Sequence, residues 1–198
     1  MRVGMSRKKI RLTRQQKRME DTLVFLLRLI ALSIPLYVIM WMDFILLPLQ
    51  SMTAGQVAWA LNAMGFAVTS KDLILSVGSG QPFIFFIGPD CTGWKSMLAF
   101  IALIFATLGA GMRKRIAGTL IGIPLIHAGN LLRIIAVVLI ERSYGLEAAK
   151  VFHDWLWQAG LIALVLALWL AWLRWDSLKK RMGSLRLHII SQLLTTKK

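Results

Sequence analysis

The sequence predicts an all-α membrane protein, a bundle of about four main transmembrane helices with a short external interfacial helix and a β-hairpin before the cysteine. Three observations predict this fold class. Apolar residues make up 57% of the 198 residues, whereas an ordinary soluble domain has about 45–50%. The mean hydropathy is +0.65. The apolar residues also gather in long runs of roughly 20 residues, the length that crosses a bilayer as a helix.

Four apolar runs define the predicted spans, and each is too long for an ordinary buried strand. They cover residues 22–49, 95–112, 116–140 and 155–173. The first run is interrupted by Arg28, Pro35 and Asp43. We do not expect it to be a cleavable signal peptide, because it is long and no small-x-small site follows a short apolar core.

The basic residues predict the orientation of the bundle and explain the formal net charge of +15. Of the 24 Lys and Arg residues, 19 lie in residues 1–20, at Arg28, at 113–115 or after residue 173, and four lie on the opposite side. Positive charge marks the cytoplasmic side, so both termini are expected there. The chain therefore divides into a basic tail (1–20), a membrane-embedded core (21–175) and a second basic tail (176–198). Anionic lipid headgroups are the expected partners of the tails. No nucleic-acid motif accompanies the charge, so nucleic acid is not expected.

The longest external segment covers residues 50–94. Helical spacing over residues 56–64 predicts a short interfacial helix that carries Trp59 at headgroup level. Residues 73–77 and 82–87 are apolar and flank the Gly-rich stretch 78–81, which predicts a hairpin. We expect residues 113–115 to form a tight cytoplasmic turn and residues 141–154 to form a second external loop.

Cys91 is the only cysteine, which excludes a disulfide scaffold and a multi-cysteine metal site. A lone cysteine is often a buried packing residue. Here it stands in a constrained turn with Thr92 and Gly93, at the expected start of the second span. A helix N-terminus lowers the pKa of a thiol, so Cys91 is also a candidate nucleophile.

Arg133 lies inside the third run, where an arginine costs at least ~2.5 kcal/mol on insertion scales and normally faces an interior site. Asn130 precedes it by three residues and shares its helix face. Two interpretations are open. Arg133 either belongs to a functional site, or forms a structural ion pair with Asp43 or Asp154.

Three histidines are present. His188 falls in the basic tail and His127 in the middle of the third run, where a hydrogen-bonded packing role is expected. His153, followed by Asp154, falls at the outer end of the fourth run, at the depth expected for Cys91. Thiol, imidazole and guanidinium together are the parts of a cysteine acyl-transfer site. The thiolate attacks a carbonyl, the histidine moves protons, and the arginine stabilises the oxyanion or orients the substrate.

At these residues the sequence resembles the archaeosortase/exosortase family of membrane-embedded cysteine transpeptidases. The matching pieces are Cys91-Thr92-Gly93, the motif Asn130-Leu131-Leu132-Arg133, and His153; residues 90–96 resemble the archaeal branch more than the bacterial one. The resemblance covers about residues 46–172. It implies that Cys91 is the nucleophile, Arg133 the electrostatic stabiliser and His153 the acid/base, with Asn130, Asp154, Thr92 and Gly93 supporting them.

The resemblance also implies partners and an activity without a metal or other cofactor. The substrates would be membrane-anchored proteins whose C-terminal signal has a short motif, a transmembrane helix and a basic cluster. The new C-terminus would pass to a lipid or another surface acceptor. Many family members have more spans than this chain, which leaves the substrate motif and the acceptor open.

Other functions stay open at this stage. A transporter or channel subunit with Arg133 as its binding charge predicts paired repeats or broken helices, and neither is visible in the sequence. A two-haem cytochrome would need His127 and His153, which lie at different depths. A quinone-linked thiol oxidase would need a second cysteine. A catalytically inactive membrane assembly factor would retain the same fold.

Overall fold

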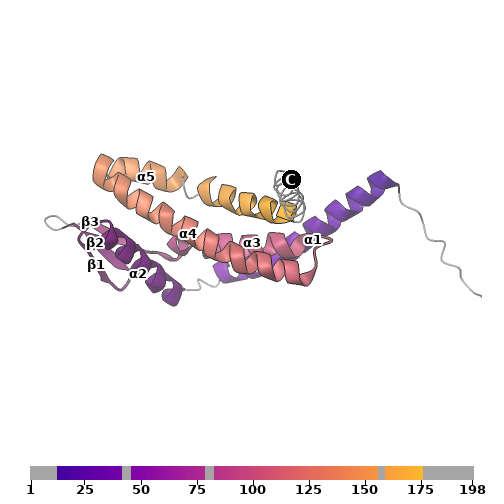
Figure 1. The fold of residues 1–198 in the computed structure, drawn as a ribbon, viewed down its shortest axis with the longest axis horizontal. Helices are drawn as coiled ribbons and strands as arrows, with labels where there is room; N and C mark the ends of the chain where they lie inside the picture. The colour runs from indigo at the N-terminus through magenta and orange to yellow at the C-terminus, as the bar shows by residue number, and fades with distance from the viewer. Residues whose placement is uncertain (1–12, 42–45, 79–82, 156–158, 176–198) are drawn as a thin grey trace, which may run out of the picture.

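Two long helices, α1 (Arg14–Trp41) and α4 (Met112–Tyr144), dominate the computed structural model (Figure 1). The structure describes residues 13–41, 46–78, 83–155 and 159–175. Both long helices are apolar over a stretch that can cross a bilayer, Arg14–Ile39 in the first and the whole of α4 in the second. The basic tails predicted for residues 1–20 and 176–198 fall mostly outside the described residues, although α1 already begins at Arg14.

The other two predicted spans correspond to shorter helices, α3 (Trp94–Ala106) and the helix Leu161–Trp175. The 13 residues of α3 rise only about 20 Å at 1.5 Å per residue, whereas a bilayer core is about 30 Å thick. Two of the four predicted spans therefore have full spanning length. The count of four spans stays a prediction.

The first predicted run is not one helix. The helix α1 ends at Trp41, and a second helix, α2 (Leu47–Ala63), begins with Pro48 in its first turn. Proline is favoured there because the first amides of a helix have no partner within it. The prediction that the span continues to residue 49 is therefore wrong. Residues 56–64, predicted as a separate short helix, form the C-terminal part of α2 and its cap at Met64.

The predicted hairpin is confirmed and belongs to a three-stranded antiparallel sheet. The strands are β1 (Val68–Lys71), β2 (Ile74–Val77) and β3 (Phe83–Phe86), in the order β1-β2-β3. In the register, Val68 pairs with Val77, and Val77 also pairs with Phe83. The first strand was not predicted, because residues 68–71 alternate poorly and only Val68 is buried. The turn predicted at residues 78–81 lies outside the described residues except for Gly78.

Two predicted turns are helical instead. Residues 113–115 lie in the first turn of α4, and the turn before it contains Gly109 at φ +76°. Arginine and lysine are good helix formers, so three basic residues do not end a helix. Residues 141–154 complete α4 and continue as α5 (Leu146–Trp155), with Gly145 at φ +84° between the two helices.

Two apolar clusters hold these elements together. One joins α2, the sheet and α4 through buried side chains that include Leu61, Leu75 and Ile134. The other joins α3, α4 and the last helix through residues that include Phe100 and Trp172. Figure 1 shows α2 and the sheet at the same end of the molecule as α5. The site described below lies beside the first cluster, against which Cys91 packs.

Glycine allows the second cluster to pack closely. A Cβ atom at Gly118 would collide with the Trp172 ring, and one at Gly122 would collide with Phe100. The Trp172 indole also donates a hydrogen bond to the carbonyl oxygen of Lys114 at 3.1 Å. Small residues at helix crossings and hydrogen bonds between helices are typical of membrane bundles, where apolar burial between helices contributes little.

Candidate active site

Cys91 lies in a short 3₁₀ helix, η1 (Pro89–Thr92), directly before α3. Its amide donates to the carbonyl oxygen of Gly88 at 3.0 Å, and the buried Thr92 hydroxyl donates to the Pro89 carbonyl at 2.8 Å. Gly93 then turns the chain with φ +74° before α3 begins at Trp94. The predicted position of Cys91 at the start of a helix is confirmed, with this glycine between the cysteine and the helix.

The prediction that the helix start lowers the pKa of Cys91 is wrong. Burial raises the pKa of this thiol, and that effect outweighs the lowering by a backbone hydrogen bond of Gly88 and by the charge of Arg133. The charge of Asp90 raises the pKa further. The physical reason is desolvation, because Cys91 packs against the cluster formed by α2, the sheet and α4. The resting side chain is therefore a neutral thiol at neutral pH.

Asn130 connects α4 to this turn. Its side-chain amide Nδ2 donates a 2.6 Å hydrogen bond to the carbonyl oxygen of Cys91, and the residue is fully buried. A Cβ atom at Gly93 would lie 3.1 Å from Asn130 Cγ, so a larger residue would press on the Asn130 side chain. The structure thus brings together Cys91, Gly93 and Asn130, which the sequence separates by up to 39 residues.

Arg133 follows one turn later on α4 and is 6% exposed. Its Nε and Nη1 atoms have no hydrogen-bond partner among the described residues. The ion pairs Lys95–Asp90, at 2.7 Å, and Lys150–Glu147, at 2.9 Å, do not involve Arg133. The two predicted structural partners, Asp43 and the Asp154 carboxylate, lie outside the described part of the structure.

A buried guanidinium with unused donors is costly unless an acceptor satisfies it. The charge of Arg133 acts on the Cys91 thiol, so the two groups are electrostatic neighbours. A carbonyl or oxyanion bound beside the sulfur would supply the missing acceptor.

His153 lies in the last turn of α5, which packs against α4. Its half-buried side chain lines a groove of about 300 Å³ between β3 on one side and α4 and α5 on the other. Glu141 and Lys150 are the charged residues that line the same groove. Asp154 was predicted as a supporting residue, and its side chain lies outside the described part of the structure.

Sequence reasoning missed two amide side chains on α2 that support the site. Gln50 is buried, and its Nε2 donates to the carbonyl oxygen of Ile87 at 3.0 Å, just before the cysteine turn. Gln56 Oε1 lies 2.6 Å from His127 Nε2 on α4, which agrees with the packing role predicted for His127. Isolated glutamines in an apolar helix could have predicted these contacts, because a buried polar side chain needs a hydrogen-bond partner.

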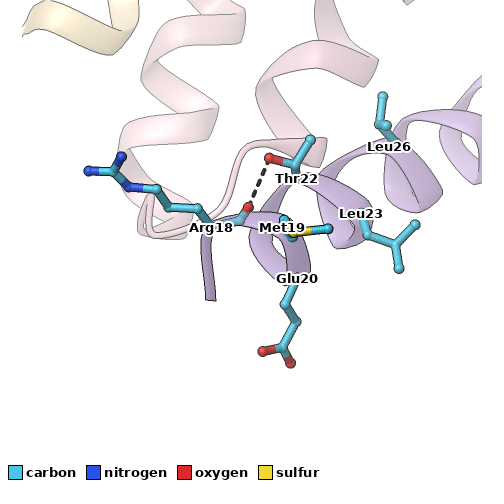
Figure 2. A pocket seen from close by; sticks show the side chains of 6 residues that line it. All are labelled: Arg18, Met19, Glu20, Thr22, Leu23 and Leu26. Carbon is cyan, nitrogen blue, oxygen red and sulfur yellow. Dashed lines mark hydrogen bonds between the residues drawn. The ribbon is translucent and has the colours of Figure 1, made fainter. Parts of the chain in front are cut away.

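A larger concavity, of about 530 Å³, lies along α1. Its wall consists of residues 18–26 of one helix, and Figure 2 shows Arg18 and Glu20 pointing in different directions. The hydrogen bond drawn there, from Thr22 Oγ1 to the Arg18 carbonyl at 2.9 Å, is internal to the helix. No convergent set of groups forms there, so we do not regard it as a reaction site.

Within the described ranges, no group of three or more His, Cys, Asp or Glu side chains is placed to hold a metal ion. The groups that the structure brings together at Cys91 are a thiol and a buried guanidinium. His153 lines the neighbouring groove, whose wall includes neither Cys91 nor Arg133.

Residues 11–156 match the family model described as Transmembrane exosortase (Exosortase_EpsH). The match includes Cys91, Asn130, Arg133 and His153. Nothing among the curated proteins matches the sequence, and none of the solved structures does either. Because the match spans well over half of the 198 residues, the chain belongs to the transmembrane exosortase family, whose members are membrane cysteine transpeptidases.

Proposed function

We propose that the protein is a cysteine transpeptidase or protease of the cell membrane that cleaves C-terminal sorting signals of surface proteins. Such a signal comprises a short motif, a transmembrane helix and a basic cluster. The new C-terminus passes to a lipid or another surface acceptor. The observation that carries the proposal is the buried guanidinium of Arg133, whose charge acts on the only cysteine of an exosortase-family chain. Its Nε and Nη1 atoms have no hydrogen-bond partner among the described residues.

The reaction uses three side chains. The Cys91 thiol gives its proton to His153, and the sulfur attacks the carbonyl carbon of the scissile peptide bond. Arg133 donates hydrogen bonds to the resulting oxyanion. The C–N bond then breaks, His153 returns the proton to the leaving amine, and a thioester remains on Cys91. An amine or hydroxyl acceptor, or water, attacks the thioester while His153 accepts its proton, and the thiol is regenerated.

The raised pKa of Cys91 makes the histidine necessary in this mechanism. A thiol that burial keeps neutral needs a base at the moment of attack, whereas a preformed thiolate would not. His153 lines the groove and α5 packs on α4, the helix of Arg133. Closure of α5 toward the substrate would complete the catalytic set.

The location and orientation are part of the same proposal. The two long apolar helices support a membrane location, and the distribution of Lys and Arg supports cytoplasmic termini with the site facing outward. The segment around Cys91 resembles the archaeal branch of the family, and we propose that the protein belongs to that branch.

The test is processing of a tagged reporter that ends in the C-terminal signal of a surface protein from the same cell. We expect the wild-type protein to shorten the reporter and Cys91→Ala to leave it intact. Ser96→Ala, one turn into α3, is the matched control and should retain processing. Full processing by Cys91→Ala would refute the proposal and favour a transporter or an inactive assembly factor.

A further inference from the structure

The outer edge of β3 is free of a neighbouring strand in the described sheet, because β3 is last in the order β1-β2-β3. An edge strand presents unpaired backbone N–H and C=O groups, which bind an extended peptide readily. The register identifies the residues that present them.

Hydrogen bonds in an antiparallel pair alternate between the two sides of each strand. The Ile87 amide donates to the Leu73 carbonyl at 2.9 Å, so the bonded pairs between β2 and β3 are Leu75 with Phe85 and Val77 with Phe83. The alternation leaves the backbone groups of Ile84 and Phe86 pointing away from β2. The Gly78 amide donates a hydrogen bond to the Ala67 carbonyl at 2.9 Å, which sets the same alternation between β1 and β2.

These two residues also lie at the groove that contains His153. All four residues of β3 line it, opposite α4 and α5. Ile84 and Phe86 are 69% and 59% exposed, so most of each residue is uncovered in the described structure. From Phe86 the chain runs through Ile87 and Gly88 directly into the cysteine turn.

From this placement we propose that the protein binds its substrate as an added β-strand on the free edge of β3. The occupant is the extended segment of a membrane-anchored protein next to its cleavage point, and this rests on the function proposed above. Backbone groups of Ile84 and Phe86 bind the substrate main chain. The groove then leads the scissile bond toward Cys91 and His153.

The proposal specifies the substrate further. β3 leads through η1 into the apolar helix α3, and a substrate whose own helix follows its motif runs in the same direction. The two strands are therefore parallel. The groove is lined by apolar side chains such as Val137, Leu146 and Ala149, so alternate substrate residues that face it are small or apolar.

Cross-linking tests the pairing without catalysis. Cys91→Ala removes the only cysteine, and Ile84→Cys or Phe86→Cys then supplies one probe on the edge. Reporters with single cysteines along the motif are oxidised with copper phenanthroline in membranes. We expect disulfides with every second reporter position, since side chains of neighbouring strands alternate between faces.

Ser70→Cys is the matched control, because by the same alternation Ser70 lies on the outer edge of β1 at the opposite side of the sheet. It should not cross-link to the reporter. Cross-links without a period of two, or equal ones from Ser70→Cys, would overturn the proposal. A disulfide-linked pair of this chain would show that a second copy occupies the edge, which would also overturn it.

Proline provides the kinetic test. Ile84→Pro removes one edge amide and should lower processing at limiting reporter about fivefold or more, the value of one hydrogen bond of ~1 kcal/mol. Ile84→Ala keeps the backbone amide, whereas Ser70→Pro removes an amide from the opposite edge of the sheet. Each of these two variants should process more reporter than Ile84→Pro does. An equal loss of reporter processing in Ile84→Pro and Ser70→Pro would contradict strand pairing at β3.

The two proposals fail separately. Alternating cross-links without Cys91-dependent cleavage would support substrate binding at β3 and refute the transpeptidase proposal. Cys91-dependent cleavage without alternating cross-links would support the transpeptidase proposal and refute substrate binding at β3.

Discussion

The side-chain amide of Asn130 donates a 2.6 Å hydrogen bond to the carbonyl oxygen of Cys91. The bond joins the middle of α4 to the 3₁₀ turn that carries the thiol. Arg133 lies three residues after Asn130, on the same face of the helix. One helix face therefore carries both the donor that binds the cysteine backbone and a cation whose charge acts on the thiol.

Asn130→Ala should destabilise the cysteine turn, because the partly buried Cys91 carbonyl loses its donor. The expected cost is about 1–3 kcal/mol, and processing should fall further than the amount of folded protein does. Both are measured on protein extracted from membranes. Asn62→Ala is the control, since Asn62 joins α2 to Val68 by comparable bonds of 3.1 Å away from the site. If both variants lose processing only in proportion to folded protein, Asn130 has no positioning role.

Gly93→Ala should lower both stability and processing, for two reasons. The backbone at φ +74° costs a non-glycine residue about 1–2 kcal/mol, and the new Cβ would press on Asn130 at 3.1 Å. Gly109→Ala isolates the second effect, because Gly109 has φ +76° and open space around it. Thermal unfolding in detergent gives the comparison. An equal loss of stability in the two variants would show that the Asn130 contact is unimportant.

The pH dependence of Cys91 alkylation should shift in opposite directions in two variants. Burial raises the pKa of the thiol, so alkylation by a small neutral reagent should rise with pH and reach its midpoint above that of an exposed cysteine. Arg133 stabilises the thiolate, so Arg133→Gln should move the midpoint higher. Asp90 destabilises it, so Asp90→Asn should move the midpoint lower. Shifts of the same sign would refute this account of the electrostatics.

Arg133→Ala should abolish processing, and Arg133→Lys should process the reporter no better than Arg133→Ala does. Lysine keeps the charge but lacks the planar fork of donors that can bind an oxyanion and a neighbouring carbonyl together. Reporter cleavage is compared at equal amounts of membrane-inserted protein. Arg142→Lys, later on the same helix, should remain near wild type. Near-normal cleavage by the Arg133→Lys protein would reduce Arg133 to a generic buried charge.

Cys91→Ala and His153→Ala should each remove several orders of magnitude of activity, and the double variant should be little worse than either. Groups that act in one step are non-additive, because removing either disables the shared step. Asp154→Ala should be milder, because this residue would only orient the imidazole. A covalent adduct trapped with a slow substrate should be located on Cys91 by mass spectrometry. An adduct elsewhere would refute the mechanism.

The hairpin and the site show what residue patterns predict well. Two apolar runs around a Gly-rich stretch predicted β2 and β3, because alternation and turn residues are local signals. The spacing of Arg133 from Asn130 likewise follows from one helix, and both residues are buried on α4. The membrane depth of Arg133 stays a prediction. Residues 68–71 lack such a signal, so β1 was missed; it forms because β2 and Asn62 pair with it.

The errors come from interactions that the local pattern does not contain. The apolar run at residues 22–49 reads as one span, although two helices, α1 and α2, share it and the second begins around Pro48. The thiol pKa was predicted from the helix start alone, whereas burial against the α2–sheet–α4 cluster decides its direction.

Composition and residue spacing are properties of the chain, and they predicted an apolar, basic membrane protein with one cysteine, an arginine inside an apolar run and the motifs of its family. The packed fold places the Asn130 amide on the Cys91 carbonyl and lines the groove of His153 with β3. It also buries Arg133 with two nitrogens that have no partner among the described residues. Each of these depends on which segments distant in sequence pack together, and that is determined by burial and hydrogen bonding across the whole fold.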